Sequence, residues 1–207
     1  MIINEQLGLS DNHGMRMFAN ELIDAQRPVN VMLLDIDDFK KINDEHGHDV
    51  GDELIVLIAN ALKQMADAYD GNAFRNFGDE FGLVIPDLTL EEVFLKAEDF
   101  RKQIVEQQTS DIHGTVSIGV ANAPRDGKDV EGVIRSASAA LYTAKENGRN
   151  RVALPPSEDM IMKTCYYPSA LINRLKQIAA RVGKKESVLL REALENLLRQ
   201  YDDLREV

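Results

Sequence analysis

The chain has 207 residues, of which 44% are hydrophobic and 29% charged, and its formal net charge is −11. This composition excludes collagen-like and disordered chains, and no stretch approaches the roughly 18 consecutive apolar residues that span a bilayer. The first five residues lack the basic and apolar regions of a signal peptide, so we expect a cytoplasmic protein with no membrane partner. The single cysteine, Cys165, excludes an internal disulfide and a cysteine-based zinc site.

Charge is distributed unevenly along the chain. Residues 1–157 hold 15 basic and 27 acidic residues, a net charge of −12, whereas residues 160–201 hold eight basic and three acidic residues, a net charge of +5. The segment between them, residues 154–159, contains two consecutive prolines, which block both helix and strand pairing. We therefore predict two domains, residues 1–155 and residues 160–207, joined by a short linker.

Hydrophobic spacing predicts helices and strands that alternate through the larger domain. The expected elements are a helix over 15–22, a buried strand over 29–36, helices over 39–45 and 54–65, a hairpin that pairs 73–77 with 81–85, a helix over 93–104, a strand over 115–121, a helix over 134–144 and a strand over 151–154. One tight hairpin among alternating elements indicates an α/β or α+β fold, with an antiparallel-containing sheet covered by helices.

Acidic residues gather where two of the expected strands meet turns. Asp35, Asp37 and Asp38 close the first strand, and Asp79 and Glu80 lie in the hairpin turn. If the strands are neighbours, the two clusters form an oxygen-rich site suited to magnesium, which proteins hold with one or two carboxylates and substrate phosphates. For either cluster alone, a solvated acidic turn is the alternative interpretation.

Four ordered blocks of sequence carry a family resemblance. The blocks are Asp35–Glu53, Gly78–Phe81 with Arg75 upstream, Thr115–Ala121 and Ala140–Asn150. Over about residues 4–154 they resemble the GGDEF-domain diguanylate cyclases, and four blocks in order are more specific than one short motif. The resemblance implies an α+β, palm-like fold of the ferredoxin-like or nucleotidyl cyclase type. It also implies an enzyme that condenses two GTP molecules into cyclic di-GMP and two pyrophosphates.

The resemblance also implies a metal site. Asp35, Asp79 and the carbonyl of Ile36 match ligands of Mg²⁺ (or Mn²⁺), and Asp79 matches the residue that helps activate the attacking 3′-hydroxyl. A divalent metal between two carboxylates can lower the pKa of that hydroxyl and offset the charge of the triphosphate.

Further residues match positions that bind the substrate GTP. Asn43 and Asp52 resemble the pair that reads the guanine edge, since an amide and a carboxylate can satisfy its acceptors and donors. The other matching positions are Phe39 and His48 beside the nucleotide, and Lys40, Lys145 and Arg149 beside the phosphates, with Lys40 also at a catalytic position. Four of them have a simpler interpretation, because Phe39 could belong to the core, His48 to an ordinary loop, and Lys145 with Arg149 to the cationic end of a helix.

The chain departs from the family pattern in its naming motif and its inhibitory site, and it matches the N-terminal block only loosely, over residues 5–12. Phe77 replaces the first glycine of the naming motif, where glycine permits a positive φ and a close approach of backbone to nucleotide. If Asn76 takes the left-handed turn position instead, Phe77 can project out of the site and leave Asp79 in place. Residues 68–71 read Ala-Tyr-Asp-Gly where the family has an inhibitory Arg-x-x-Asp, so we predict no product feedback through that site.

The C-terminal segment predicts a small basic domain. A short strand over 162–168 and helices over 169–182 and 187–201 carry more apolar surface than so few residues can bury, so we expect dimerisation. The pattern resembles a ribbon-helix-helix domain, in which paired strands from two chains enter the DNA major groove. That resemblance places five residues at DNA, namely Met162, Thr164, Tyr166, Lys184 and Lys185. A dimerisation module that reads no specific DNA is the alternative, because apolar side chains read bases poorly.

Taken together, these features favour a dimeric diguanylate cyclase whose C-terminal domain could bind DNA. Dimerisation suits the reaction, because each half-site holds one GTP and a dimer raises the effective concentration of the second half-site. The alternative is a catalytically impaired GGDEF-like domain that senses GTP or a cyclic dinucleotide within a DNA-binding transcriptional regulator. A third reading, a structural dimer with both activities lost, would leave the polar site residues unexplained.

Overall fold

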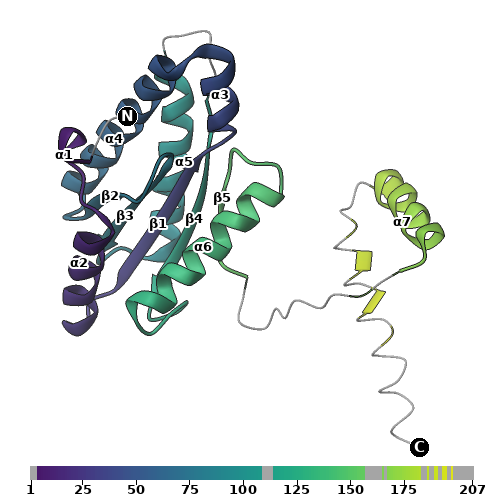
Figure 1. Ribbon diagram of the computed structural model, residues 1–207. Helices are drawn as coiled ribbons and strands as arrows, with labels where there is room; N and C mark the ends of the chain where they lie inside the picture. The colour runs from purple at the N-terminus through teal and green to yellow at the C-terminus, as the bar shows by residue number, and fades with distance from the viewer. Residues whose placement is uncertain are drawn as a thin grey trace, which may run out of the picture. The chain divides into compact units, whose positions relative to one another are not determined.

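The computed structural model describes residues 4–108, 114–156, 165 and 167–182, together with residues 186, 189–190, 193–194 and 197. The chain divides into two compact units, Met1–Met160 and Ile161–Val207. The first unit contains a helix-covered sheet, and the second contains the helix α7, Ser169–Val182 (Figure 1).

A five-stranded sheet in the order β2-β3-β1-β4-β5 organises the first unit. The strands are β1 (Val29–Ile36), β2 (Asn72–Arg75), β3 (Glu80–Pro86), β4 (Val116–Ala123) and β5 (Val152–Ala153). β1 pairs antiparallel with both β3 and β4, β2 pairs antiparallel with β3, and β5 pairs parallel with β4. This mixed sheet confirms the expected α+β class with an antiparallel-containing sheet.

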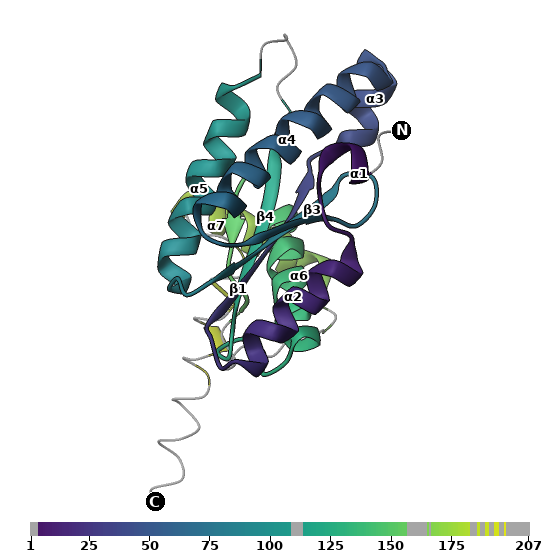
Figure 2. The same cartoon turned by 90° about the vertical axis from the view of Figure 1, so that its left-hand side faces the viewer.

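Helices cover both faces of the sheet (Figure 2). The helices of this unit are α1 (Asn4–Leu7), α2 (Asn12–Asp24), α3 (Phe39–His46), α4 (His48–Ala68), α5 (Leu90–Glu106) and α6 (Val130–Glu146). Alternate residues of β1 point to opposite faces: Met32 and Leu34 join the cluster with α4 and α5, while Val31 and Leu33 join the cluster with α2 and α6. β1 is buried along its whole length, as its continuous apolar run predicts.

Two local features position the ends of elements that reach the site. α3 and α4 are joined through the single residue Gly47, whose φ of 91° suits glycine and permits a sharp corner between the helices. The second feature is the end of α6, which stops at Glu146 and carries Lys145 in its last turn. The alternative interpretation, a cationic helix end, therefore describes the position of Lys145 but not that of Arg149, which follows the helix.

In the second unit, α7 spans Ser169–Val182, the bounds expected from the sequence. In the expected strand over 162–168, the described residues Cys165, Tyr167 and Pro168 belong to no strand, and the other residues of that segment lie outside the described residues. The five residues expected at DNA, Met162, Thr164, Tyr166, Lys184 and Lys185, lie outside the described residues. None of the described helices combines the length and apolar character that crossing a bilayer requires.

Candidate active site

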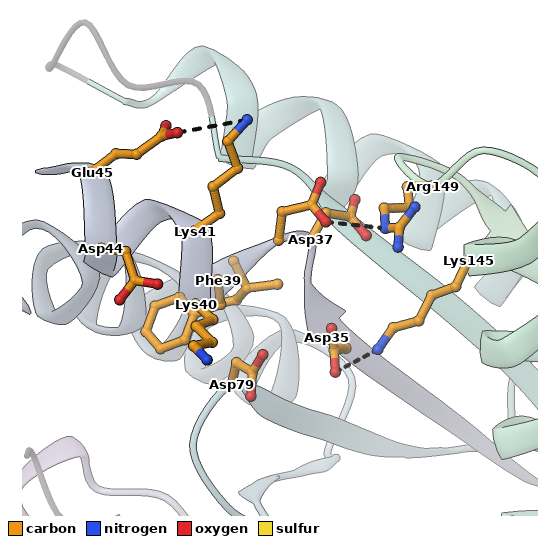
Figure 3. Close-up of a pocket in the computed structure, with 12 residues that line it drawn as sticks. Asp35, Asp37, Phe39, Lys40, Lys41, Asp44, Glu45, Asp79, Lys145 and Arg149 are labelled. Carbon is orange, nitrogen blue, oxygen red and sulfur yellow. Dashed lines mark ion pairs between the residues drawn. The ribbon is translucent and has the colours of Figure 1, made fainter.

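Two carboxylates, one on a strand and one in the turn before the neighbouring strand, line one cavity of about 600 Å³ (Figure 3). Asp35 lies near the end of β1, and Asp79 lies in the turn between β2 and β3. The strands bring them together because β1 pairs with β3, which places Asp35 opposite Glu80, and the Ile36 N–H donates to the Asp79 carbonyl at 3.4 Å. The expectation that adjacent strands unite the two acidic clusters is correct.

A lysine from α6 is paired with the buried carboxylate. The Nζ atom of Lys145 lies 2.7 Å from Oδ2 of Asp35, and Asp35 is only 7% exposed. Burial raises the pKa of Asp35, the contact with Lys145 opposes this rise, and the negative charges of Asp79 and Glu80 add to it. A positive partner therefore stabilises the charged form of Asp35, which burial and the neighbouring carboxylates disfavour.

Further cations that line the cavity are Lys40 and Lys41 on α3 and Arg149 after α6. Lys40 in the first turn of α3 is exposed at the cavity, and Arg149 follows α6. The Nε atom of Arg149 lies 3.5 Å from Oδ1 of Asp38. With Lys145, these side chains give the cavity positive charge beside its carboxylates, an arrangement that can hold a polyanion together with a cation.

The three acidic residues at the end of β1 have different environments. Asp35 faces the cavity, whereas the carboxylate of Asp37 accepts hydrogen bonds from Thr115, Ser117 and the main chain of Asn150. Asp38 is exposed and adopts a left-handed backbone with φ of 55° at the start of α3. The three residues form one cluster in the sequence, but their carboxylates differ. That of Asp37 is taken up by hydrogen bonds and that of Asp38 is exposed, so Asp35 is the buried carboxylate of the three that is left to bind a cation or substrate.

A second cavity of about 400 Å³ adjoins the first through Phe39, which lines both. It is lined by Phe39, Asn43, His48, Asp52, Ile55, Arg75 and Gly78. The Oδ1 atom of Asn43 is buried and has no hydrogen-bond partner in the protein. An unsatisfied buried acceptor is costly, so this atom suits a ligand that brings a donor.

Local structure explains why Asn43 and Asp52 share this cavity. They lie on α3 and α4, which meet at the Gly47 corner. His48 is the first residue of α4, so the alternative of an ordinary loop histidine is wrong, and the residue is exposed at the cavity. Phe39 is partly buried against the core and also lines both cavities, so the two interpretations offered for it are compatible.

The backbone of the hairpin turn accommodates Phe77 in place of the first glycine of the motif. The only residue of this turn with a positive φ is Gly78, at 58°; neither Asn76 nor Phe77 has one. Asn76 therefore does not take the left-handed position considered for it, because the retained second glycine already supplies that conformation. Phe77 is 84% exposed and projects away from the site, although Asn76 is not left-handed.

Arg75 supports the same turn and was noted in the sequence only as lying upstream of the motif. It is buried, its Nε donates to the Gly78 carbonyl at 2.9 Å, and its guanidinium lies 5.3 Å from the centre of the Phe81 ring. Burial lowers the pKa of Arg75, while the negative charges of Asp52 and Asp79 oppose this shift. In the sequence, the sign of this supporting role is a charged residue, Arg75, next to a phenylalanine within an expected strand.

The donor set of the first cavity fits a hard divalent cation. The carboxylate-bearing residues Asp35 and Asp79 line it, together with Ile36, and carboxylate oxygens are ligands that such a cation prefers. Among the described residues, no group of three or more His, Cys, Asp or Glu side chains is arranged to hold a metal ion. A cation at this site would therefore complete its coordination with oxygens from a ligand or from water.

Comparison with known families and proteins agrees with this geometry. Residues 13–151 match the family model described as "Diguanylate cyclase, GGDEF domain". The chain is 37% identical over 131 residues to the response regulator PleD of Caulobacter vibrioides, covering 60% of this chain and 29% of PleD. It is 34% identical over 145 residues to the diguanylate cyclase DosC of Escherichia coli K12, covering 67% of this chain and 31% of DosC. The chain thus matches about a third of the length of these relatives.

Solved structures show the same fold. The active GGEEF domain of a diguanylate cyclase from Vibrio cholerae superposes with a TM-score of 0.66 at 28% identity, over 72% of this chain and 99% of that domain. The coiled coil and GGDEF domain of DgcB from Caulobacter crescentus, solved with c-di-GMP, gives a TM-score of 0.62 at 29% identity, over 70% of this chain and 81% of that one. Because the family model covers more than half of the sequence and the fold agrees, the chain belongs to the GGDEF-domain diguanylate cyclase family.

Proposed function

We propose that this protein is a diguanylate cyclase that condenses two GTP molecules into cyclic di-GMP and two pyrophosphates. The observation that carries the proposal is the pairing of two cavities, one with carboxylates and cations and one with an unsatisfied amide oxygen. Their chemistry matches the two ends of a nucleotide, since the first suits a triphosphate and the second suits a base edge.

The guanine base would bind in the smaller cavity. Guanine presents N–H donors and acceptors along its edge, and the Oδ1 atom of Asn43 is a buried acceptor without a partner. The half-buried carboxylate of Asp52 on the same cavity adds acceptors for the N–H groups that guanine has and adenine lacks. This pair therefore favours GTP over ATP as the substrate.

The triphosphate would bind in the larger cavity. Lys40, Lys145 and Arg149 line it and offset phosphate charge. Asp35, Asp79 and the Ile36 carbonyl would hold Mg²⁺ (or Mn²⁺), which supplies further charge neutralisation and lowers the pKa of a bound hydroxyl. Asp79 would accept the proton of the attacking 3′-hydroxyl at a carboxylate oxygen. Lys145 would keep its cationic group beside the phosphates as the bond to the leaving pyrophosphate breaks.

The reaction requires two half-sites, so we propose that the protein acts as a homodimer formed through its C-terminal unit. In this unit Leu171, Leu194 and Leu197 are 56%, 56% and 48% exposed. Apolar side chains gathered in so small a unit favour association with a second copy. A dimer tethered in this way raises the effective concentration of one loaded half-site near the other.

The same unit supports a proposed contact with DNA. Residues 160–201 carry a net charge of +5, although the whole chain is at −11, and positive charge attracts phosphate. If the unit is a ribbon-helix-helix domain, the contacts come from Met162, Thr164, Tyr166, Lys184 and Lys185. Salt-dependent retardation of a mixed duplex DNA by the full chain, lost on replacing both Lys184 and Lys185 with glutamine, would support this part of the proposal.

Phe77 favours a second candidate, a GTP or cyclic dinucleotide sensor without turnover in a DNA-binding regulator. The replacement removes a glycine of the naming motif and leaves an aromatic side chain 84% exposed beside the site. The cyclase is preferred because Phe77 does not occupy the left-handed position and does not line either cavity.

The two candidates separate in one assay. Purified protein is incubated with GTP and Mg²⁺, the products are resolved by chromatography, and Asp79→Ala serves as the control. We expect cyclic di-GMP from the wild type alone. Folded, dimeric wild-type protein that binds GTP and makes no product would reject the cyclase and support the sensor. Product from Asp79→Ala would instead reject the role given to that carboxylate.

A further inference from the structure

One buried carboxylate beside the larger cavity is not used by the chemistry proposed above. Asp37 is 5% exposed. Its Oδ1 accepts a hydrogen bond from Ser117 Oγ at 2.7 Å, and its Oδ2 accepts from Thr115 Oγ1 at 2.6 Å and from the Asn150 N–H at 3.0 Å. The carboxylate therefore joins the end of β1, the start of β4, and the turn between α6 and β5.

The end of α6 and the turn that joins it to β5 carry two cations of the larger cavity. Lys145 lies in the last turn of α6 and Arg149 lies in the turn itself (Figure 3). Arg149 and Asn150 have φ values of 59° and 45°, a left-handed conformation that residues other than glycine adopt only at a cost. Consecutive residues in this conformation keep their shape only where surrounding contacts hold them.

Two contacts hold Asn150, and they lead to different elements. Arg101 on α5 donates from Nη1 to the side-chain oxygen of Asn150 at 2.7 Å. Asp37 binds the main-chain N–H of Asn150, the peptide group that directly follows Arg149. Of these two contacts, only the one with Asp37 leads to the end of β1, where Asp35 lies; the ion pair between Arg149 and the exposed Asp38 is a further link between the turn and this part of the chain.

We propose that Asp37 is a positioning residue that holds Arg149 and Lys145 in register with Asp35 for binding of the triphosphate. The inference rests on the proposed function, because it assumes that GTP binds at this site. Asp37 lines the larger cavity and not the smaller one, so its loss affects the phosphates and not the base.

The proposal is tested by binding of two probes, GTP with Mg²⁺ by calorimetry and guanosine by saturation-transfer NMR. Asp37→Ala removes the acceptor for the Asn150 N–H, and we expect GTP affinity to fall roughly tenfold while guanosine binding is unchanged. In Asp37→Asn, one oxygen still accepts from Asn150 and Thr115, and the amide nitrogen can donate to Ser117. We expect this variant to bind GTP within about threefold of the wild type, because the positioning bonds survive without the charge.

A matched control removes a different structural carboxylate. Asp126 accepts from the main-chain N–H of Asn122 at 2.9 Å near the far end of β4. Like Asp37→Ala, Asp126→Ala removes a carboxylate that accepts a hydrogen bond from a main-chain N–H, but it does so away from both cavities. We expect its GTP affinity to match that of the wild type.

Several results would overturn the positioning role. Equal loss of GTP affinity in the alanine and asparagine variants would show that the charge of Asp37 is used directly. Unchanged GTP affinity in Asp37→Ala, or joint loss of GTP and guanosine, would also refute it. If Asp37→Ala does not fold, Asp37→Ser replaces it, since a serine hydroxyl is too short to reach Asn150. Wild-type protein that binds no GTP would refute the proposed function itself.

Discussion

The side-chain amide of Asn43 occupies the space directly over the Cα atom of Gly51, where any other residue at position 51 would place its Cβ. The two residues belong to α3 and α4, and the Phe39 ring closes the same space, with its Cε2 atom 3.1 Å from that Cβ position. The orientation of Asn43 in the smaller cavity therefore depends on the absence of a side chain at Gly51.

Gly51→Ala is expected to weaken GTP binding roughly tenfold, because the new Cβ displaces the amide that we assign to the guanine edge. Alanine in a helix otherwise stabilises it by about 1 kcal/mol relative to glycine. Gly14→Ala in α2, where the nearest atoms lie 3.4 Å or more from the Cβ position, is the matched control and should bind GTP normally. Calorimetry with both variants checks this, and equal affinities would contradict the assignment of Asn43.

Phe77→Gly is expected to leave the rate of cyclic di-GMP formation within about threefold of the wild type, because the Phe77 side chain is 84% exposed and its backbone does not need glycine. Gly78→Ala provides the contrast. A Cβ added at Gly78 would have no atom within 4 Å, so the substitution costs only backbone strain at φ of 58°. We expect it to lower the free energy of unfolding by about 1 kcal/mol. Steady-state rates and denaturant unfolding of both variants decide the matter; a large gain of activity in Phe77→Gly would show that Phe77 impairs the site.

Much of this fold follows from local patterns in the sequence. The apolar run of β1 and the helical spacing of α4 and α5 identify buried faces, because period and burial are directly linked. The bounds of β1 and α7 agree with expectation to the residue. Strand order does not follow from such patterns, since the placement of β1 between β3 and β4 depends on contacts between distant residues.

The site shows the same division. Asp35, Asp79 and Asn43 are recognisable from ordered motifs, because the spacing of those motifs reflects the elements that carry them. The role of Asp37 is not visible in the sequence, because its partners Thr115 and Asn150 are 78 and 113 residues away. The left-handed position in the hairpin turn does not follow from the sequence either, since both Asn76 and Gly78 can adopt that conformation.

Stability should depend on pH through Glu98. Burial alone would raise the pKa of Glu98, but hydrogen bonds from Arg101 and from the Val152 N–H outweigh burial and hold the pKa below its usual value. A carboxylate with a lowered pKa stabilises the folded state above its unfolded pKa, and this contribution is lost as pH falls through the folded pKa.

Glu98→Gln should therefore lower the free energy of unfolding by about 1 kcal/mol at pH 7, and the difference should shrink as the pH falls below 4.5. Denaturant unfolding at a series of pH values measures it. Glu106→Gln, an exposed position on the same helix, is the control and should change little at any pH. A deficit that stays constant down to pH 3 would show that lost packing, rather than lost charge, is responsible.

Leu194→Glu is expected to shift the protein towards monomer and to lower the cyclase rate per chain at least tenfold at low micromolar concentration, because a charge in an apolar interface is costly. Leu95→Glu is the matched control, since Leu95 is 64% exposed on α5 in the first unit. Sedimentation and rate measurements across protein concentration test both. Full activity in a monomeric Leu194→Glu protein would exclude the C-terminal unit as the source of the required dimer.

The most direct test of the central claim is the stoichiometry of product formation by the full chain supplied with GTP and Mg²⁺. The account predicts two pyrophosphates for each cyclic di-GMP, no product from Asp79→Ala, and little product when ATP replaces GTP. Pyrophosphate and cyclic di-GMP are measured in the same samples, with GTP binding confirmed for each protein. Binding of GTP by the dimeric wild type without release of either product would contradict the account.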